Sequence, residues 1–394
     1  MDDKKADGIF LCRYSANLFR IALPKKKKMR DDNHRKSSAH KDRYSLSLAF
    51  AGDSCPNTLT DLVTLLILFL TPVLAGGCSR FTQDDDGMYE DDMVYTKVDA
   101  SVPRGAVVRC IDIFFFNDDK LQRLDSYQRM EGGDVKSATG ASRVGKKILV
   151  VLANASENRL TWTDINSLSS LSKVTAELAN ENPAVPMMCG IMRLETGNVR
   201  SVTIPLEPLM SKVELVSIKA DFSGRSYAGA KIENIKAYLT NVSGTCRLIP
   251  DSAAISGVIL NSGRLSQSDL SLMAVPGMLM QQLDGPLGAS ARNPEMEFCC
   301  YPSESPETGP GTPPTRLVLE GSIEGSTYYY PVDINRGTHA LGKDGIGRNS
   351  RYRISMDITR KGADTPDTAV DAATAEVHLE IVPWLMKPAT TEIF

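Results

Sequence analysis

The sequence predicts an all-β protein, with two β-sandwich domains that follow a lipoprotein signal. Three observations support this prediction. From residue 93 onward, short alternating or apolar runs are separated by turn residues; one stretch alone has helical spacing; and an apolar run ending in Cys78 precedes them all. Many short strands with few helices are typical of sandwiches. We expect an N-terminal extension with a signal peptide over residues 1–77 and an acidic tether over residues 78–92. The N-terminal sandwich is expected over residues 93–244 and the C-terminal sandwich over residues 245–394.

Cys78 ends an apolar segment, residues 62–75, that is too short to span a bilayer as a mature helix. Ala75, Gly76 and Gly77 are small enough for an extended backbone to enter a peptidase cleft, and the next thiol can be acylated. This arrangement indicates a bacterial lipoprotein signal with lipidation at Cys78. The alternative is a short buried helix with an incidental cysteine.

Residues 1–60 are unusual for a signal peptide, because they are long and their basic residues lie well before the apolar core. Whether this stretch is native is left open.

Of the 45 basic and 48 acidic residues, 13 and 8 respectively lie within residues 1–77. Residues 78–394 therefore hold 32 basic and 40 acidic residues, a net charge of −8. We therefore expect no nucleic-acid partner. Residues 78–92 carry two acidic runs, as a solvated extended tether would.

The first sandwich is predicted from six strand-like runs and one helix. In the first strand, Val94, Thr96 and Val98 lie on one face, and Pro103 ends it. A second, more buried strand ends at the turn 117–119. A helix is expected over residues 162–179, where apolar residues recur at helical spacing. The other expected strands are 147–153, 201–205, 212–220 and 232–242.

The second sandwich is also predicted from short strand-like runs separated by turn residues. Residues 296–301 form a short strand, and the Pro- and Gly-rich segment 302–314 is a loop. Residues 316–322 and 326–334 are expected to form a hairpin around Glu324-Gly325. Two alternating strands follow; in the last, Val377, Leu379 and Ile381 face one way and Glu376, His378 and Glu380 the other.

Catalytic and metal-binding motifs are missing from the sequence, so we expect no enzyme activity, no cofactor and no metal. It contains no GxSxG, HExxH or Walker-type loop. Five cysteines follow Cys78, an odd number without CxxC spacing, and we interpret them as small buried hydrophobic residues. Asp364, Asp367 and Asp371 lack the ligand rhythm of a calcium loop and indicate a solvated turn.

Five segments, taken in order, resemble the fimbrillin-family pilins of Bacteroidetes. Residues 345–359 are similar to that family's penultimate strand, and residues 375–384 to its terminal strand ending in Trp384. Residues 111–127, 148–154 and 204–213 agree with its N-terminal pattern. Together they extend over nearly all of 78–394, and the acidic tract after Cys78 resembles a surface-export signal of such lipoproteins.

This resemblance implies two transthyretin-like domains and a structural subunit of an adhesive surface fimbrium. The implied partners are other pilin subunits, the outer membrane through a lipid, and a maturation protease that cuts after Arg or Lys and removes the first strand. A neighbouring subunit's strand would then fill the exposed groove by donor-strand exchange, because a sandwich lacking a strand exposes backbone groups and an apolar trough. A shaft, anchor or tip role stays open.

Arg104 is the cleavage candidate, because it lies in the loop between the first two strands. Its alternatives are a plain loop arginine, or cleavage at Arg80 or Lys97. Val377, Leu379, Ile381 and Trp384, with the tail to Phe394, are the donor-strand candidates that the resemblance implies; the alternative is a terminal strand folded into its own domain.

A rival function is a monomeric surface lipoprotein that binds a glycan or a host protein. Exposed aromatic side chains would favour it, and Tyr328-Tyr329-Tyr330 is the clearest cluster. Because neighbouring strand residues alternate faces, at least one of the three is expected in the core.

Overall fold

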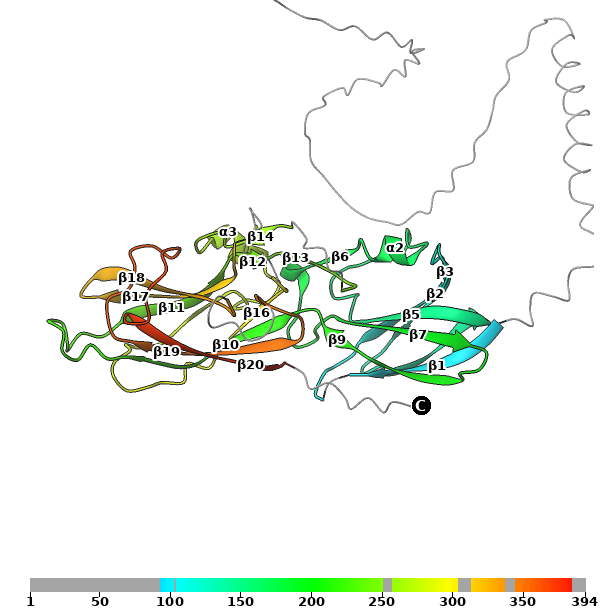
Figure 1. Ribbon diagram of the computed structural model, residues 1–394, viewed down its shortest axis with the longest axis horizontal. Coiled ribbons are helices and arrows are strands. Elements are labelled where there is room, and N and C mark those ends of the chain that lie inside the picture. Colours follow the sequence, from blue (N-terminus) through cyan, green and yellow to red (C-terminus); the bar gives the residue numbers. More distant parts are fainter. Residues whose placement is uncertain (1–92, 103, 251–256, 304–312, 337–343, 385–394) are drawn as a thin grey trace, which may run out of the picture. The chain divides into compact units, whose positions relative to one another are not determined.

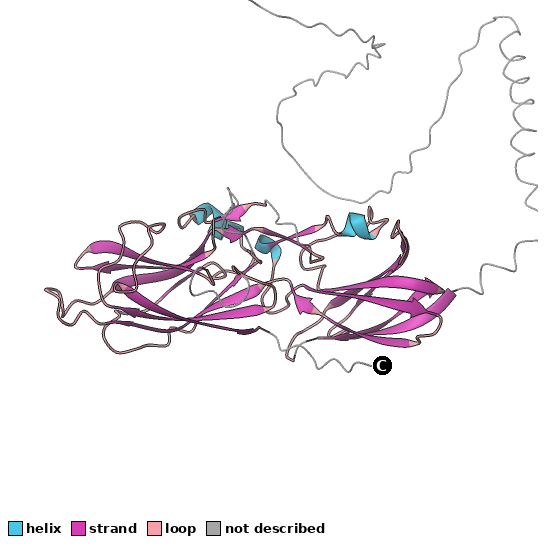
Figure 2. Ribbon diagram, viewed as in Figure 1, coloured by secondary structure: helices cyan, strands magenta, loops and turns pink. Residues whose placement is uncertain are grey.

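The computed structural model describes residues 93–102, 104–250, 257–303, 313–336 and 344–384. Strands dominate these residues and helices are few and short (Figure 2). The prediction of an all-β fold is therefore confirmed.

The first half of the described chain forms two sheets that enclose a core. One sheet has the order β4-β1-β8 and the other β3-β2-β5-β7-β9. Their bounds are β1 Met93–Ser101, β2 Cys110–Asn117, β3 Leu124–Glu131, β4 Ser137–Arg143, β5 Gly145–Ala153, β7 Met188–Thr196, β8 Ser201–Pro205 and β9 Glu207–Pro208.

Strands β2 and β5 are buried along almost their whole length, which explains their continuous apolar sequences. Phe115 and Val151 pack into a cluster shared with β1 and β8. Phe114 and Val150 point to the opposite face and join the larger core that contains Leu171. The five-stranded sheet is thus covered on both sides.

The second half also forms two sheets, of order β16-β10-β19-β20 and β15-β11-β17-β18. In Figure 1, β11, β17 and β18 lie above β10, β19 and β20. The bounds are β10 Ser211–Ala220, β11 Glu233–Thr240, β15 Met280–Gln282, β16 Met296–Cys300, β17 Arg316–Ile323, β18 Ser326–Asp333, β19 Ser350–Ile358 and β20 Ala375–Pro383. The predicted hairpin turns at Glu324-Gly325, and both residues have positive φ.

The two halves repeat one strand order. In chain order, β1, β2, β3, β4, β5, β7 and β8 correspond to β10, β11, β15, β16, β17, β18 and β19. In each half the fourth, first and seventh strands form one sheet, and the third, second, fifth and sixth form the other. The first and seventh strands are parallel in both halves. The second half has one more strand, β20, beside its seventh.

The strand pairing changes from one half to the other between β9 and β10. Pro208 still pairs with Met188 of β7, whereas Ser211 already pairs with Cys300 of β16. Strands β10 and β11 both precede residue 244 and pair with strands that follow it. A boundary at 244/245 would therefore cut through both sheets of the second half.

The helix expected over 162–179 is wrong. Only α2, Leu168–Leu171, is helical there, and β6 Thr175–Glu177 and the 3-10 helix η1 Leu178–Asn180 follow it. Ser167 and Ser170 cap α2 reciprocally, and serine side chains compete for backbone groups within helices. The remaining elements are β12 Val242–Ser243, β13 Thr245–Arg247, β14 Ile259–Leu260 and α3 Gln267–Leu272.

Candidate functional site

Strand β1 is the central strand of its sheet. It pairs with β4 in antiparallel register from Met93 to Asp99 and with β8 in parallel register from Lys97 to Ser101. The two neighbours are therefore held apart by β1. A chain lacking β1 would have a gap between β4 and β8 with unpaired backbone groups on both sides.

The inward side chains of β1 fill an apolar trough. Thr96 and Val98 are 0% and 1% exposed, whereas Tyr95 on the outer face is 70% exposed. Val98 packs in a cluster with Phe115, whose side chain comes from the opposite sheet. Burial of one valine side chain stabilises a fold by about 1.5–3 kcal/mol. The trough thus favours an occupant with small apolar side chains at alternate positions.

Arg104 is exposed and lies with Gly105 in the turn that follows β1. Gly105 has a φ of +87°, a conformation that favours glycine. This turn carries the chain from the three-stranded sheet to β2 in the other sheet. Cleavage after Arg104 would separate β1 from the rest of the chain without cutting either sheet.

The backbone becomes anchored just after this turn. The Arg109 N–H donates to Asn154 Oδ1 at 2.8 Å, and Asn154 Nδ2 donates to the Val107 carbonyl at 2.9 Å. Ala106 and Val108 are buried. A new N-terminus at Gly105 would therefore remain attached to the core by the next residues.

The two competing basic residues differ in what the structure shows. Lys97 lies within β1, where its backbone is paired on both sides, and its ammonium contacts Asp99 at 2.8 Å. A paired strand cannot readily extend into a protease cleft. Arg80, Cys78 and the whole of 1–92 lie outside the described residues.

Three donor-strand candidates lie on β20 and the fourth, Trp384, directly follows it; β20 forms an edge of its sheet and pairs with β19. Val377, Leu379 and Ile381 are half-buried against the core. Trp384 is 7% exposed, and the Lys212 ammonium lies 4.7 Å from its ring centre. In this structure β20 is therefore folded into its own half; residues 385–394 lie outside the described part.

Strand β1, which the turn at Arg104 follows, and the donor candidate β20 lie in different sheets. The sequence analysis did not single out β4 and β8, which line the trough with Ala138 and Ile204. Ile204 lies within an expected strand, but no local signal shows that this strand pairs with one more than a hundred residues earlier.

The tyrosine cluster is divided between core and surface. Tyr330 is fully buried, and its hydroxyl donates to the Arg360 carbonyl at 3.0 Å. Tyr328 is half-buried, and the Lys361 ammonium lies 5.7 Å from its ring centre. The expectation that at least one tyrosine lies in the core is confirmed.

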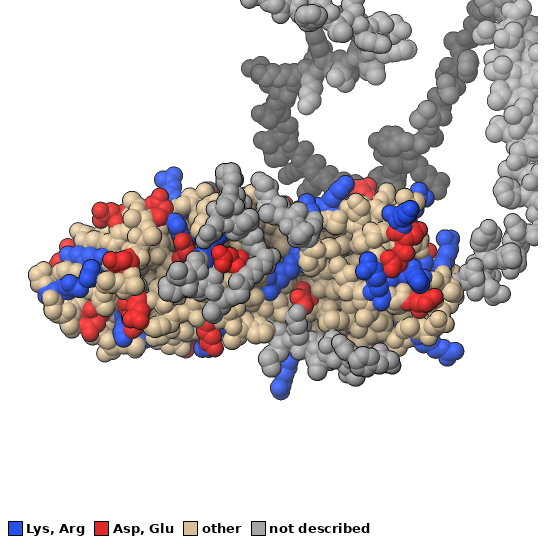
Figure 3. Space-filling model, in the orientation of Figure 1, with Lys and Arg blue, Asp and Glu red and all other residues tan. Residues whose placement is uncertain are grey.

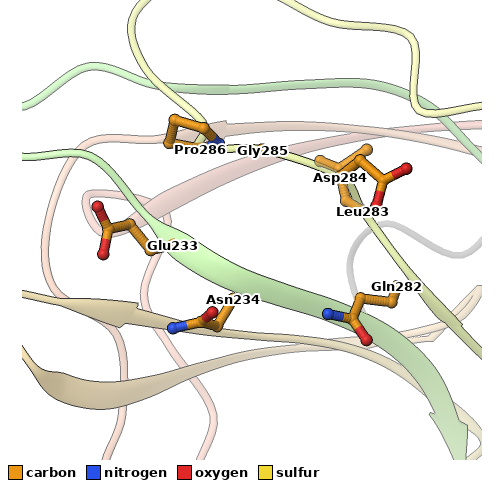
Figure 4. A pocket seen from close by; sticks show the side chains of 7 residues that line it. All are labelled: Glu233, Asn234, Gln282, Leu283, Asp284, Gly285 and Pro286. Carbon is orange, nitrogen blue, oxygen red and sulfur yellow. The ribbon is translucent and has the colours of Figure 1, made fainter.

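A hollow of about 260 Å³ lies beside the end of β15. Figure 4 shows that polar side chains surround it; its lining residues are Glu233, Asn234, Gln282, Leu283, Asp284, Gly285 and Pro286. Over the described ranges, no three His, Cys, Asp or Glu side chains are grouped so that they could hold a metal ion. The hydroxyls of Thr365 and Thr374 donate to Asp367 and Asp371 at 2.6 Å, so both carboxylates already have partners.

The five described cysteines are buried and unpaired. Burial raises the pKa of Cys246 to about 11 and of Cys189 and Cys299 to about 12. Such thiols stay protonated at neutral pH and are poor nucleophiles. They behave as small apolar core residues, as the sequence analysis expected.

Basic and acidic side chains are interspersed over the face shown in Figure 3. Several form cross-strand pairs, such as Arg316 with Asp333 and Lys236 with Glu320. Among the helices in the described part of the chain, none has the length and apolar character needed to cross a membrane.

Comparison with known proteins identifies the relatives of the chain. No protein-family model matches it. It is 26% identical over 193 residues to the major fimbrium subunit FimA type-4 of Porphyromonas gingivalis strain W83, a match covering 46% of this chain and 48% of that protein. A second FimA type-4 sequence of the same species is 26% identical over 192 residues. The chain thus matches about half the length of these curated relatives.

Solved structures share the fold. A candidate cell adhesion protein from Bacteroides eggerthii superposes with a TM-score of 0.57 at 16% identity, covering 76% of this chain and 98% of that one. A fimbrilin from Porphyromonas gingivalis W83 gives a TM-score of 0.55 at 14% identity, covering 75% and 98%. The chain is homologous to the FimA fimbrial subunits of Porphyromonas and has the fimbrillin fold.

Proposed function

We propose that the chain is a structural subunit of an adhesive surface pilus, assembled by protease-triggered donor-strand exchange. Its homology to fimbrial subunits, which are structural proteins and not enzymes, supports this role. In this proposal Cys78 carries the lipid that directs the precursor to the outer membrane, and the acidic tether 78–92 separates the lipid from the fold.

One observation supports the assembly mechanism best. Strand β1 is central in its sheet and is followed by an exposed arginine turn. Release of an edge strand would open one new edge, whereas release of β1 opens a trough between two strands. A donor strand in that trough would gain backbone partners on both sides and an apolar floor.

Strand β20 of a second copy is the proposed donor. Its alternation of Val377, Leu379 and Ile381 with polar residues matches the alternation of β1. It is an edge strand in its own sheet, so its release breaks pairing with β19 alone among the described strands.

The test is controlled digestion of the purified chain with an arginine-specific protease. N-terminal sequencing of the product is expected to find Gly105 as its first residue. Unheated SDS gels are expected to show a ladder of oligomers. Arg104→Ala should abolish both products. A ladder that forms without cleavage, or complete cleavage at Arg104 without a ladder, would contradict the mechanism.

Two variants of β20 test the donor assignment. Leu379→Asp places a charge on the face that would enter the trough and should remove the ladder while cleavage continues. His378→Asp changes the outward, exposed neighbour and should leave the ladder intact. Equal ladders from both variants would exclude β20 as the donor. A chain that remains monomeric after cleavage would favour the rival function of a monomeric binding protein.

A further inference from the structure

The β4-β1-β8 sheet has two edges that differ in how their backbone groups are used. On β4, the N–H groups of Ala141 and Arg143 face away from β1. They donate to Gln128 Oε1 at 3.3 Å and to Asp125 Oδ2 at 2.8 Å. Side chains of the other sheet therefore close this edge.

The β8 edge is not closed by a strand of the described chain, since β8 pairs with β1 alone there. The Lys97 N–H donates to the Arg200 carbonyl at 2.9 Å, and the Leu206 N–H to the Ser101 carbonyl at 2.9 Å. Because strand backbone groups alternate in direction, the Val202 and Ile204 groups point to β1. The N–H of Thr203 therefore points outward.

Residue 205 also fits an edge position. Pro205 has an outward position on β8, where a residue without an N–H removes no hydrogen bond to β1, and its carbonyl lies against Gly190 of β7, so the open part of the edge is at Ser201 and Thr203. Ser201 and Thr203 are exposed. The edge thus offers outward donors at Ser201 and Thr203, a pattern suited to strand addition.

The internal repeat indicates what this edge accepts. Strand β8 is the seventh strand of the first half, and β19 is the seventh strand of the second. Beside β19 lies β20, antiparallel and in register from Ser350 with Pro383 to Ile358 with Ala375. The same fold therefore has a place for an eighth strand, which the second half fills and the first half leaves open among the described residues.

Charge complementarity also favours β20 as the strand that binds the outer edge of β8. The outward face of β20 carries Glu376 and Glu380, and Glu380 forms an ion pair with Arg353 in its own sheet. At the β8 edge, Arg200 is exposed directly before the strand, whereas Lys97, opposite Ser201, is already paired with Asp99. Arg200 is thus the basic side chain that the acidic row of β20 would approach.

We propose that the outer edge of β8 is a second strand-acceptor site, which binds β20 of another copy of this chain without prior cleavage. The contact joins different surfaces of the two copies, so it propagates head to tail. This second site depends on the proposed function in one respect only, namely that β20 can leave its own sheet and pair with another copy. The trough remains occupied by β1 throughout.

The test uses the uncut Arg104→Ala chain, so that failure here does not affect the cleavage mechanism. Sedimentation without detergent is expected to show reversible association that rises with concentration and that, unlike the ladder of the cleaved chain, does not survive SDS. Thr203→Pro removes an outward N–H and should weaken the association about tenfold or more. Thr203→Ala keeps the N–H and should associate like the parent. Equal association of all three proteins would overturn the proposal.

Mixing two defective proteins gives a sharper outcome. The Thr203→Pro chain retains β20 as a donor, and a Leu379→Asp chain retains the β8 edge as an acceptor. At a concentration at which the parent associates and the Thr203→Pro chain does not, each alone should be monomeric, and the mixture should stop at a heterodimer. A mixture that stays monomeric, or that forms longer oligomers, would contradict the assignment.

Hydrogen exchange locates the contact. A synthetic peptide of residues 375–384 should slow exchange of the Thr203 amide in the uncut parent and leave the Thr203→Pro chain unbound. A Thr203 amide already protected in the isolated monomer would show that the chain covers this edge itself, which would overturn the proposal.

Discussion

Asp112 lies fully buried on β2 and accepts hydrogen bonds from three side chains. The Tyr127 hydroxyl donates at 2.8 Å, Arg129 Nε at 2.7 Å and Trp162 Nε1 at 2.9 Å. The Trp162 ring also packs edge-on against Phe114 at 5.3 Å. One carboxylate therefore fixes the loop that contains Trp162 against the sheet.

Asp112→Asn is expected to lower the free energy of unfolding by about 3–5 kcal/mol, because it leaves the Arg129 guanidinium without its buried counter-charge. Guanidinium-induced unfolding measures the loss. Glu131→Gln is the matched control, since Glu131 is exposed and lies 3.6 Å from Arg129. Its effect should stay below about 1 kcal/mol; equal losses would exclude the buried pair as the cause.

Glu181 is also buried, but its hydrogen-bond donors are neutral. The Tyr301 hydroxyl donates at 2.9 Å and the Met187 N–H at 3.4 Å. Burial raises the pKa of Glu181 to about 7 from its ordinary 4.5. The folded chain therefore keeps a proton between these pH values that the unfolded chain has lost.

Stability should consequently fall as the pH rises from about 4.5 to about 7, by up to about 3 kcal/mol from this group. Glu181→Gln should flatten that slope and make the protein more stable than the parent at pH 7.5. Thermal unfolding at several pH values measures both effects. Glu177→Gln, at an exposed position on β6, should leave the slope unchanged; an unaltered slope in Glu181→Gln would refute the assignment.

At the scale of elements, the repeated strand order indicates that β20 is an additional strand of the second half. The first half encloses its core with seven corresponding strands, and the second half has the same seven plus β20. The side chains Val377, Leu379 and Ile381 are only half-buried. Strand β20 therefore adds stability to a sandwich that is already complete.

A chain ending at Thr374 is expected to remain folded, with a lower Tm and a circular-dichroism strand signal reduced only by the contribution of β20. A chain that starts at Gly105 and so lacks β1 should lose far more, because β1 is central and its inward residues are fully buried. Comparable losses from the two truncations would contradict the distinction between an edge strand and a central strand.

At the scale of the molecule, the largest buried cluster combines side chains from both halves. It contains Phe114 and Val150 from the first half and Val213 and Leu319 from the second. The pairing of β6 with β13 adds backbone contacts between the segments before and after β10. We expect the uncut chain to unfold in one calorimetric transition. Two well-separated transitions would show that the shared cluster does not couple the halves.

Local pattern predicted most strands of five or more residues, because the side-chain period of a strand is visible within a few residues; β3, β4 and β7 were not predicted. The alternation of Val377, Leu379 and Ile381 gave the inward face of β20, and the turn at Glu324-Gly325 gave the hairpin. The helix expected at 162–179 failed because its apolar residues, including Ile165 and Val174, reach the core from irregular backbone. Spacing alone does not distinguish these cases.

The sequence by itself determined the all-β class, the positions of most of the longer strands, the alternating faces of a few of them such as β1 and β20, and Arg104 as a residue between two strands. The tertiary structure decided that β1 is central, that β8 pairs with β1 and β19 with β10 in parallel register, and that β20 lies at an edge. The reason is physical. Alternation records which face of a strand meets the core, whereas the choice of a partner depends on backbone groups that are identical in every residue except proline.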